Sequence, residues 1–530
     1  MHTITKTIAT SMLLAAACVE THAAEPDSTI VTEDMVGAAA MPARMTPVTE
    51  APFSMDSLSR PVFPAKSMTL SPDCVSANGL ITPAINDMIA ELSASGGGTI
   101  VVPRGKWRSG RITLKSNVNL RVERNAELIF SGEIEDYLPA VFTRHEGVEV
   151  MGAGAFIYAN GETNIALTGK GIISGPDMGA LMRKLPNGNS VVENDIDYNL
   201  PVEERICDGM NGNIFYRPKS FAPVNCKNVL VEGVTFERSV LWNVNPIYCE
   251  NVIIRGITVN STDVPSGDGI DISSCRNVLI EYSTLNCGDD CFTLKAGRCE
   301  DGVRVNRPTE NVVIRYCLAK EGHGGITCGS ETAGWINNVY LHHCVFNGTR
   351  TGIRFKTRRN RGGGISGIVC DNIRMTGVRE AFTWDLLGSA TYMGELARRY
   401  PPLDITPLTP TVRDIRISNF TVESSERMMS VHGIPEIPCA EVTLEKGTVD
   451  TGVIFKAMED INGLTLRDIT INATDNNMTI DNAGNIVFDG VTLNVPGKAL
   501  NLDIKGGQTS KITLLNNGAA KELKQGLNEL

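Results

Sequence analysis

The chain has 530 residues, of which 42% are hydrophobic, only 5% are aromatic and 51 are glycine. Its 49 basic and 60 acidic residues give a formal net charge of −11, which argues against nucleic acid as a partner. A chain of this length exceeds one ordinary compact core, so we expect several domains or one elongated repeat.

The first 23 residues are typical of an export signal peptide. Lys6 gives a positive start, residues 8–19 are mostly apolar, and residues 21–23 (Thr-His-Ala) match a cleavage site. The apolar run is too short to span a membrane, and no later segment is suited to a transmembrane helix. An alternative is lipoprotein processing at Cys18. We expect an exported protein, periplasmic or extracellular, or an outer-membrane lipoprotein anchored through Cys18.

Residues 24–66 are polar and rich in proline, and their composition predicts a flexible segment before a main domain at 67–530. Within that domain, apolar residues recur at helical spacing between Ile81 and Ser95, and Gly96 to Gly98 end the pattern. We expect an amphipathic helix that caps the N-terminal end of the domain and prevents pairing at its edge.

A short phrase recurs through most of the chain. Asn228-Val-Leu-Val-Glu-Gly-Val-Thr-Phe has copies starting at Asn251, Asn277, Asn311 and Asn338, at intervals of 23 to 34 residues. Repeats of this length indicate a solenoid, and alternation of apolar and polar residues indicates strands. The recurring Asn suits a sharp bend, because Asn tolerates left-handed backbone, and its amide can bond the next Asn. Val and Ile dominate, and the frame of leucine-rich repeats is absent, so we predict an all-β fold, a parallel β-helix.

The 14 cysteines become 13 after signal removal, which leaves at least one thiol unpaired in an oxidising compartment. Many follow strand-like runs, and we interpret them as small apolar filler of the repeat core. No cysteine spacing matches a zinc site.

Four short motifs, separated by intervals close to the repeat length, carry chemical groups. If each lies on a successive coil, their side chains stack on one face. Paired carboxylates are the acid/base equipment of glycoside hydrolysis, and a cationic pair two residues apart on one strand face suits an anionic sugar. The motifs are Ser266-Gly267-Asp268, Gly288-Asp289-Asp290, Gly322-His323-Gly324 and Arg354-Phe355-Lys356.

These motifs, in this order, resemble those of the polygalacturonase-type glycoside hydrolases of family 28. The resemblance spans roughly residues 75–375, with a compatible repeat beyond. It implies a right-handed single-stranded parallel β-helix. It also implies catalysis by Asp268, Asp289, Asp290 and His323, with substrate binding by Arg354 and Lys356 and no metal or organic cofactor.

In the family, the residue matching Asp289 is the general acid, and we expect the charges of Asp268 and Asp290 to raise its pKa. Those two carboxylates are expected to position and deprotonate water, with inversion at the anomeric carbon. His323 would tune the carboxylates or bind substrate. Lys295 is a weaker substrate-binding candidate. Asp271 is interpreted as structural, because strand alternation separates it from Asp268.

We therefore expect hydrolysis of α-linked galacturonic acid in pectin, with exo action if the irregular stretches 177–215 and 386–411 close one end of the groove. Ser266 and Gly267 replace the Asn and Thr usual in the first motif, and Ser174-Gly175 replaces a usual Asp-Gly, which affects the expected subsites. A rhamnogalacturonan hydrolase is an alternative. A calcium-dependent pectate lyase and a non-catalytic glycan-binding β-helix are further rivals.

Overall fold

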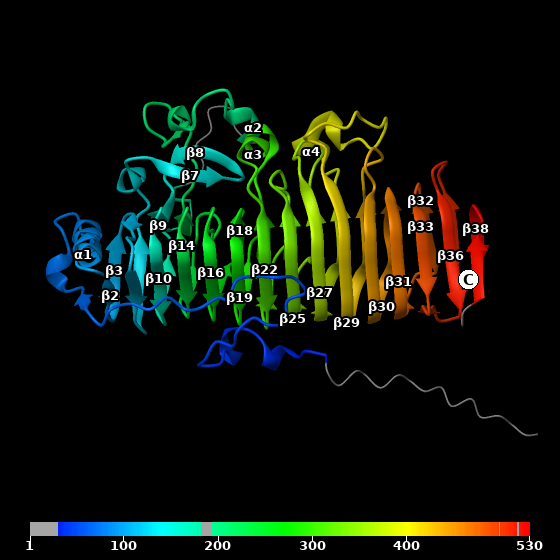
Figure 1. Ribbon diagram of the computed structural model, residues 1–530, viewed down its shortest axis with the longest axis horizontal. Helices are drawn as coiled ribbons and strands as arrows, with labels where there is room; N and C mark the ends of the chain where they lie inside the picture. Colours follow the sequence, from blue (N-terminus) through cyan, green and yellow to red (C-terminus); the bar gives the residue numbers. More distant parts are fainter. Residues whose placement is uncertain (1–29, 178, 182–191, 498, 517–518, 530) are drawn as a thin grey trace, which may run out of the picture.

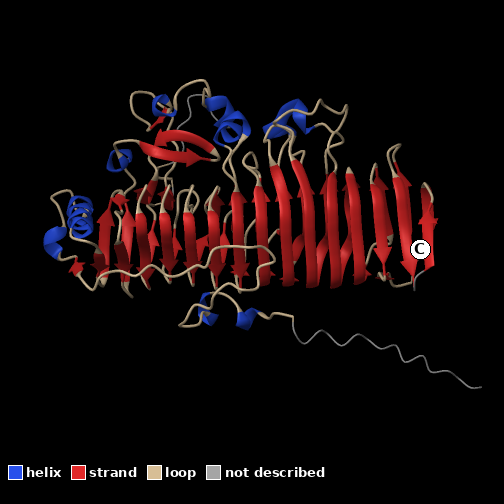
Figure 2. Ribbon diagram, in the orientation of Figure 1, coloured by secondary structure: helices blue, strands red, loops and turns tan. Residues whose placement is uncertain are grey.

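The computed structural model describes residues 30–177, 179–181, 192–497, 499–516 and 519–529. These residues form one long solenoid, in which each strand pairs in parallel with its counterpart on the next coil (Figure 1). Strands dominate, and the few short helices lie outside the coils (Figure 2). The predicted parallel β-helix is confirmed.

Each coil contributes strands to three faces. The first face contains β2 (Gly98–Val102), β5 (Val118–Val122), β10 (Thr163–Gly169), β14 (Lys227–Glu232), β16 (Glu250–Arg255), β19 (Arg276–Glu281) and β22 (Thr309–Arg315). The second contains β3 (Gly105–Ser109), β6 (Ala126–Phe130), β11 (Ile172–Ser174), β15 (Thr235–Glu237), β17 (Thr258–Ser261), β20 (Thr284–Cys287) and β23 (Leu318–Ala319). The third contains β4 (Ile112–Thr113), β9 (Ala155–Asn160), β13 (Lys219–Val224), β18 (Ile270–Ser273), β21 (Phe292–Lys295), β24 (Gly324–Gly329), β26 (Thr351–Lys356) and β28 (Val378–Asp385).

Later coils use longer strands that bend around the corners. These are β25 (Ile336–Asn347), β27 (Gly364–Thr376), β29 (Thr411–His432), β30 (Cys439–Glu459) and β31 (Ile461–Ala473). The C-terminal strands are β32 (Asn477–Asp481), β33 (Gly484–Asp489), β34 (Thr492–Asn494), β35 (Asn501–Lys505), β36 (Ser510–Asn516), β37 (Ala519–Leu523) and β38 (Gly526–Glu529). At this end the pairing becomes antiparallel, between β36 and β37 and between β35 and β38.

The recurring asparagines form the expected ladder. Asn251 has a φ of 57°. Its Nδ2 donates to Oδ1 of Asn228 at 3.0 Å, and Nδ2 of Asn277 donates to Oδ1 of Asn251 at 3.4 Å. The left-handed bend and the amide ladder together explain why the repeat keeps Asn at this phase.

Apolar side chains from all three faces fill the interior of the solenoid. All 13 cysteines within the described residues are free, and all but Cys74 are buried. Most of them belong to the apolar core, which confirms the interpretation of these as core filler. No helix in the described part of the chain combines the length and apolarity needed to cross a membrane.

The helix predicted near Ile81 is α1 (Thr82–Ala94), which buries Ile85, Ile89 and Leu92. Figure 1 places it at the N-terminal end of the solenoid. Its role in preventing edge pairing stays a prediction.

The segment before the domain runs along the outside of the second and first faces as a strap, of which the structure describes residues 30–66 (blue in Figure 1). Leu58 and neighbouring apolar residues of the strap cover an outward row on the coils, which includes Leu230 and Leu279. Oε1 of Glu50 lies 2.7 Å from NH1 of Arg315. The boundaries at 24 and 66 stay a prediction, but the composition gave no sign of these contacts.

Candidate active site

The four motifs lie on successive coils of the third face, as their spacing predicted. Ile270 lies opposite Phe292, and Phe292 lies opposite Ile326. Asp268 and Asp290 each lie two residues before their strands, β18 and β21, whereas Arg354 to Lys356 end β26. The backbone N–H of Gly269 donates to the carbonyl of Asp290 at 3.0 Å.

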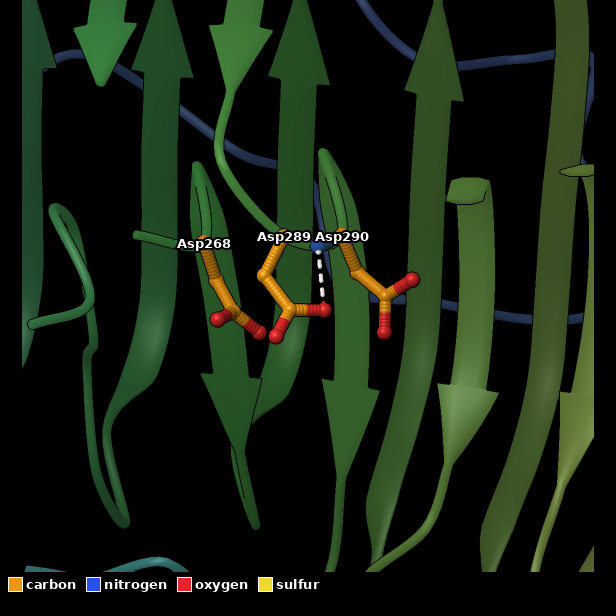
Figure 3. Close-up of side chains that lie close together, drawn as sticks. All are labelled: Asp268, Asp289 and Asp290. Atoms are coloured by element: carbon orange, nitrogen blue, oxygen red, sulfur yellow. Dashed lines mark hydrogen bonds between the residues drawn. The ribbon is translucent and has the colours of Figure 1, made fainter. Parts of the chain in front are cut away.

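The carboxylates of Asp268, Asp289 and Asp290 converge, with one oxygen of each within 4.8 Å of the others (Figure 3). The backbone N–H of Asp290 donates to Oδ1 of Asp289 at 3.0 Å. The side chain of Asp289 is 26% exposed, whereas those of Asp268 and Asp290 are 5% and 2% exposed. Asp289 is therefore the carboxylate most open to a substrate.

Glycines beside the carboxylates make this approach possible. A Cβ on Gly324 would lie 2.7 Å from Oδ1 of Asp290, and one on Gly288 would lie 2.3 Å from the carbonyl oxygen of Val264. Side chains at these positions would displace the carboxylates or the neighbouring backbone.

Cationic groups from the later motifs meet the carboxylates. Nδ1 of His323 lies 3.0 Å from Oδ1 of Asp289, and NH1 of Arg354 lies 3.4 Å from Oδ1 of Asp290. Lys356 is two residues beyond Arg354 on β26, and both residues have the parity that points outward from the coil. Burial and the charge of Arg354 lower the pKa of Lys356, against the opposing effect of Asp290 and Asp289.

Lys295, at the end of β21, holds a more central position than the sequence suggested. Its side chain is 6% exposed, and Nζ lies 3.9 Å from Oδ2 of Asp268 and 3.6 Å from Oδ1 of Asp271. Nζ also lies 3.3 Å from Oε2 of Glu331, a residue that the sequence analysis did not single out. In the sequence, Glu331 is marked only as a charged residue that follows β24.

The expectation that strand alternation separates Asp271 from Asp268 was wrong, because Lys295 contacts both side chains, whereas the structural role of Asp271 stays a prediction. Its side chain is fully buried beside Lys295, and its negative charge raises the pKa of Asp268. The alternation argument failed because β18 begins at Ile270. Asp268 lies before the strand, where alternation does not determine the direction of its side chain.

The expected direction of the pKa shift at Asp289 was also wrong. Burial alone would raise the pKa of Asp289, but the hydrogen bond from His323 and the charge of Lys356 lower it to about 2. The opposite holds for Asp268. Its pKa is raised well above the usual range by burial and by the neighbouring charges of Asp271 and Asp289. The cations close to Asp289 outweigh the like charges that the sequence analysis considered.

A hairpin covers the third face on the N-terminal side of the carboxylates. It consists of β7 (Val141–His145) and β8 (Val148–Gly152), and it lies across the coils in Figure 1. Val141 and Phe142 pack against a cluster of outward side chains that includes Tyr158 and Ala222. The Tyr158 hydroxyl donates to the carbonyl of Phe142 at 2.7 Å. The outward surface of these coils is therefore occupied by protein.

Part of the stretch 177–215 supports this hairpin; residues 178 and 182–191 lie outside the described residues. The rest includes α2 (Val192–Asp195) and β12 (Ile206–Cys207), which pairs with β8. Val192 packs against Val148 and Val150 of the hairpin. This stretch therefore packs on the hairpin β7–β8, which in turn covers the third face.

The stretch 386–411 contains α4 (Ala390–Met393). Arg359, which lies outside this stretch, holds it through a backbone carbonyl. The guanidinium of Arg359 donates to the carbonyl of Arg399 at 2.9 Å and pairs with Glu436. Arg359 follows Lys356 closely in the chain, so this stretch stands beside the cationic end of the site. Its role in closing the groove stays a prediction.

Carboxylate oxygens this close together are ligands that a divalent cation accepts. Here Lys295, His323 and Arg354 already lie beside the same carboxylates and offset their charge. The donor set therefore suits proton transfer better than metal binding, and we assign no metal to it.

Comparison with known proteins gives consistent results. The model of the family described as "Glycosyl hydrolases family 28" matches residues 207–462, which include all four motifs. A probable polygalacturonase from Vitis vinifera is 27% identical over 381 residues, covering 70% of this chain and 71% of that protein. An exo-poly-alpha-D-galacturonosidase from Dickeya chrysanthemi is 25% identical over 351 residues, covering 62% of this chain and 57% of that protein.

Solved structures agree. The exopolygalacturonase from Thermotoga maritima superposes with a TM-score of 0.68 at 28% sequence identity, covering 78% of this chain and 94% of that chain. A family 28 exopolygalacturonase from Yersinia enterocolitica gives a TM-score of 0.61 at 20% identity, covering 85% of this chain and 79% of that chain, a likeness of fold alone.

Proposed function

Because the chain belongs to the family 28 glycoside hydrolases, of the polygalacturonase type, we propose that it removes α-linked galacturonic acid from the end of pectic chains. The observation that carries the proposal is the cluster of three carboxylates beside the cationic pair Arg354 and Lys356. The carboxylates provide the acid and base, and the cations suit a uronate. The predicted signal peptide supports export to the compartment where a polymeric substrate is found.

Asp289 is proposed as the general acid that protonates the leaving oxygen. It is the most exposed of the three carboxylates, and His323 is the proton-bearing group beside it. Asp268 and Asp290, which are almost fully buried, would hold and deprotonate the attacking water. The resemblance implies inversion of the anomeric carbon.

The distance between the carboxylates does not by itself favour inversion. Two-carboxylate inverting enzymes usually separate the groups by about 6.5–9.5 Å, and retaining enzymes by about 5–5.5 Å. Here one oxygen of each group lies within 4.8 Å of the others. A single water can nevertheless bond two oxygens at this separation, because each hydrogen bond is about 2.7–2.8 Å long. Nuclear magnetic resonance of the first anomer released tests the stereochemistry directly.

Exo action is supported by the hairpin β7–β8. A sugar chain that lies along the third face and extends past Asp271 would cross the coils of Ala222 and Tyr158, and the hairpin packs against the cluster that these residues form. A groove blocked on this side admits the end of a chain and excludes its middle. The nature of the sugar that follows the cleaved bond is part of the test, because Ser266 and Gly267 alter the first motif.

The test is incubation of the purified mature chain with homogalacturonan, galacturonate oligomers and rhamnogalacturonan fragments, with products separated by size. We expect galacturonic acid monomer from the start of the reaction. Asp289→Asn should lose this activity, whereas Asp73→Asn, at an exposed position near the N-terminus, serves as the matched control. Random mid-chain products would overturn exo action.

Other outcomes would support other functions. Release from rhamnogalacturonan fragments alone would replace homogalacturonan as the substrate. Unsaturated products that absorb ultraviolet light and require calcium would indicate a lyase. Unchanged glycan processing in Asp289→Asn would contradict the acid role.

A further inference from the structure

Lys295 is an ammonium group enclosed almost completely by the protein. It faces the carboxylates of Asp268, Asp271 and Glu331 at 3.9, 3.6 and 3.3 Å. On its remaining side, Nζ lies 4.5 Å from the centroid of the Trp242 ring. Of these three carboxylates, only that of Glu331 lies within hydrogen-bond distance of Nζ. The side chain of Lys295 is only 6% exposed, which argues against the substrate-binding role considered from the sequence.

The position of Lys295 is fixed from behind by Arg298. NH2 of Arg298 lies 2.8 Å from Oε1 of Glu331, whose other oxygen faces Lys295. The backbone N–H of Arg298 donates to the carbonyl of Gly147, in the turn of the hairpin β7–β8. NH1 of Arg298 lies 3.0 Å from Oε2 of Glu193, in α2. One network of buried charges thus connects the hairpin β7–β8 and α2 with the carboxylate cluster.

Asp271 depends on this network. It is fully buried, and neither of its carboxylate oxygens has a hydrogen-bond partner among the described residues. Lys295 is the cation in contact with it. Since an uncompensated buried carboxylate is costly, removal of Lys295 favours proton uptake by the pair formed by Asp268 and Asp271.

We propose that Lys295 is a positioning residue for the reaction: together with Glu331 and Arg298, it opposes the neighbouring aspartates and favours the ionised form of Asp268, the form that accepts a proton from the attacking water. The inference rests on the proposed hydrolase function. It assigns Lys295 to the charge balance of the base, separate from the binding of uronate by Arg354 and Lys356.

Several charged groups surround the pair formed by Asp268 and Asp271. Asp268 faces Asp271, Asp289, Lys295 and Asp290, and the charges of the three aspartates favour its protonated form. The charge of Glu331 also favours the protonated form of Asp271. Lys219 lies near Asp271 as well, and burial lowers the pKa of Lys219 to about 7. Lys295 is thus the cation that acts on both members of the pair.

The experiment compares Lys295→Met and Lys295→Arg with the wild type, using a galacturonate oligomer across a pH series. For Lys295→Met we expect kcat to fall by about 10²- to 10³-fold, within the range that general base catalysis supplies, with KM changed less than about threefold. The acidic limb of kcat should move to higher pH, because Asp268 then loses its proton at higher pH. Lys295→Arg keeps the charge, so its acidic limb should stay at the wild-type pH even if kcat falls.

Two results would overturn the proposal. One is a rise in KM with unchanged kcat in Lys295→Met, which indicates substrate binding. The other is a displaced acidic limb in Lys295→Arg, a variant that retains the buried charge and is informative even if Lys295→Met does not fold. Thermal unfolding of each variant identifies loss of structure.

A second readout is independent of the substrate. Carboxyl carbon resonances of labelled aspartate, with Asp268 assigned through Asp268→Asn, report the titration of that group directly. We expect Asp268 to titrate at higher pH in Lys295→Met than in the wild type; an unchanged titration contradicts the proposal. This result stands even if the wild type cleaves none of the galacturonans offered, an outcome that would reject the proposed function alone.

Discussion

Gly324 offers a sharp test of how the carboxylate cluster is built. A Cβ at this position would lie 2.2 Å from Oγ1 of Thr327 and 2.7 Å from Oδ1 of Asp290. Both atoms belong to side chains, and the backbone of Gly324 is outside the left-handed region. The change Gly324→Ala therefore displaces side chains of the site without straining the coil.

The magnitude follows from these distances. Contacts shorter than 3.0 Å are not tolerated by a Cβ, so Oδ1 of Asp290 must retreat by a few tenths of an ångström and Thr327 by more. A misplacement of about 1 Å in a catalytic arrangement costs on the order of 10²-fold in rate. We therefore expect kcat to fall by roughly 10- to 100-fold, which corresponds to about 1.4–2.7 kcal/mol in the barrier.

The assay is steady-state release of reducing ends, combined with thermal unfolding. Gly324→Ala should unfold close to the wild-type temperature. Gly325→Ala should be destabilised by about 1–3 kcal/mol, because its Cβ would meet the buried ring of Phe346 at 2.6 Å. Gly507→Ala, where no atom lies within 4 Å, is the neutral control. Wild-type kcat in Gly324→Ala would refute the role of close packing around Asp290.

Three further outcomes are expected. Asn251→Ala should cost about 1–3 kcal/mol in urea unfolding, from the ladder hydrogen bond and the left-handed backbone, whereas Asn251→Gly should lose only the hydrogen-bond part. Burial opposes ionisation of Glu50, but the backbone of Thr49 and the charge of Arg315 lower its pKa to about 2. Its stabilising effect should therefore be complete above about pH 4.5 and disappear as the pH falls towards 2, and Glu50→Gln should remove this dependence in unfolding measured against pH. Finally, the basic limb of kcat should lie at higher pH than that of kcat/KM, because a bound uronate offsets a cation that lowers the pKa of Asp289.

The sequence was sufficient for features that depend on its period. The Asn phase, the parallel strands and the stacking of the four motifs all follow from a repeat that can be counted along the chain. Helix α1 followed from a second periodicity, with Ile85, Ile89 and Leu92 on its buried face. Each of these features is a local pattern that repeats because neighbouring coils stack, so it can be predicted from a single sequence.

Other features depend on contacts between distant residues. Lys295 and Glu331 are 36 residues apart, and nothing in the spacing indicates that their side chains meet. The strap crosses the coils without periodicity, so its packing on Leu230 and Leu279 was invisible. The position of Asp271 shows the same limit, because alternation orders side chains only within a strand and Asp268 lies before β18 begins.

Kinetics can decide which of Asp268 and Asp289 is the general acid and which is the base. Environments that separate the pKa values of two carboxyl groups usually identify acid and base, and by that rule alone Asp268 would be the acid. Accessibility argues the other way, because Asp268 is 5% exposed and Asp289 is 26% exposed beside His323. A leaving oxygen can meet Asp289 more readily, and bound substrate reduces the cationic effect that keeps Asp289 ionised.

A substrate whose leaving group needs no protonation separates the two readings. On a 4-nitrophenyl α-galacturonide, a variant that lacks only the general acid should regain much of the roughly 10²- to 10⁴-fold loss it shows on a natural oligomer. A variant that lacks the base should stay slow on both substrates. We expect Asp289→Asn to show the recovery and Asp268→Asn to remain slow. The reverse pattern would exchange the two roles, and it would mean that the proton held by Asp268 in the free protein is the one delivered to the sugar.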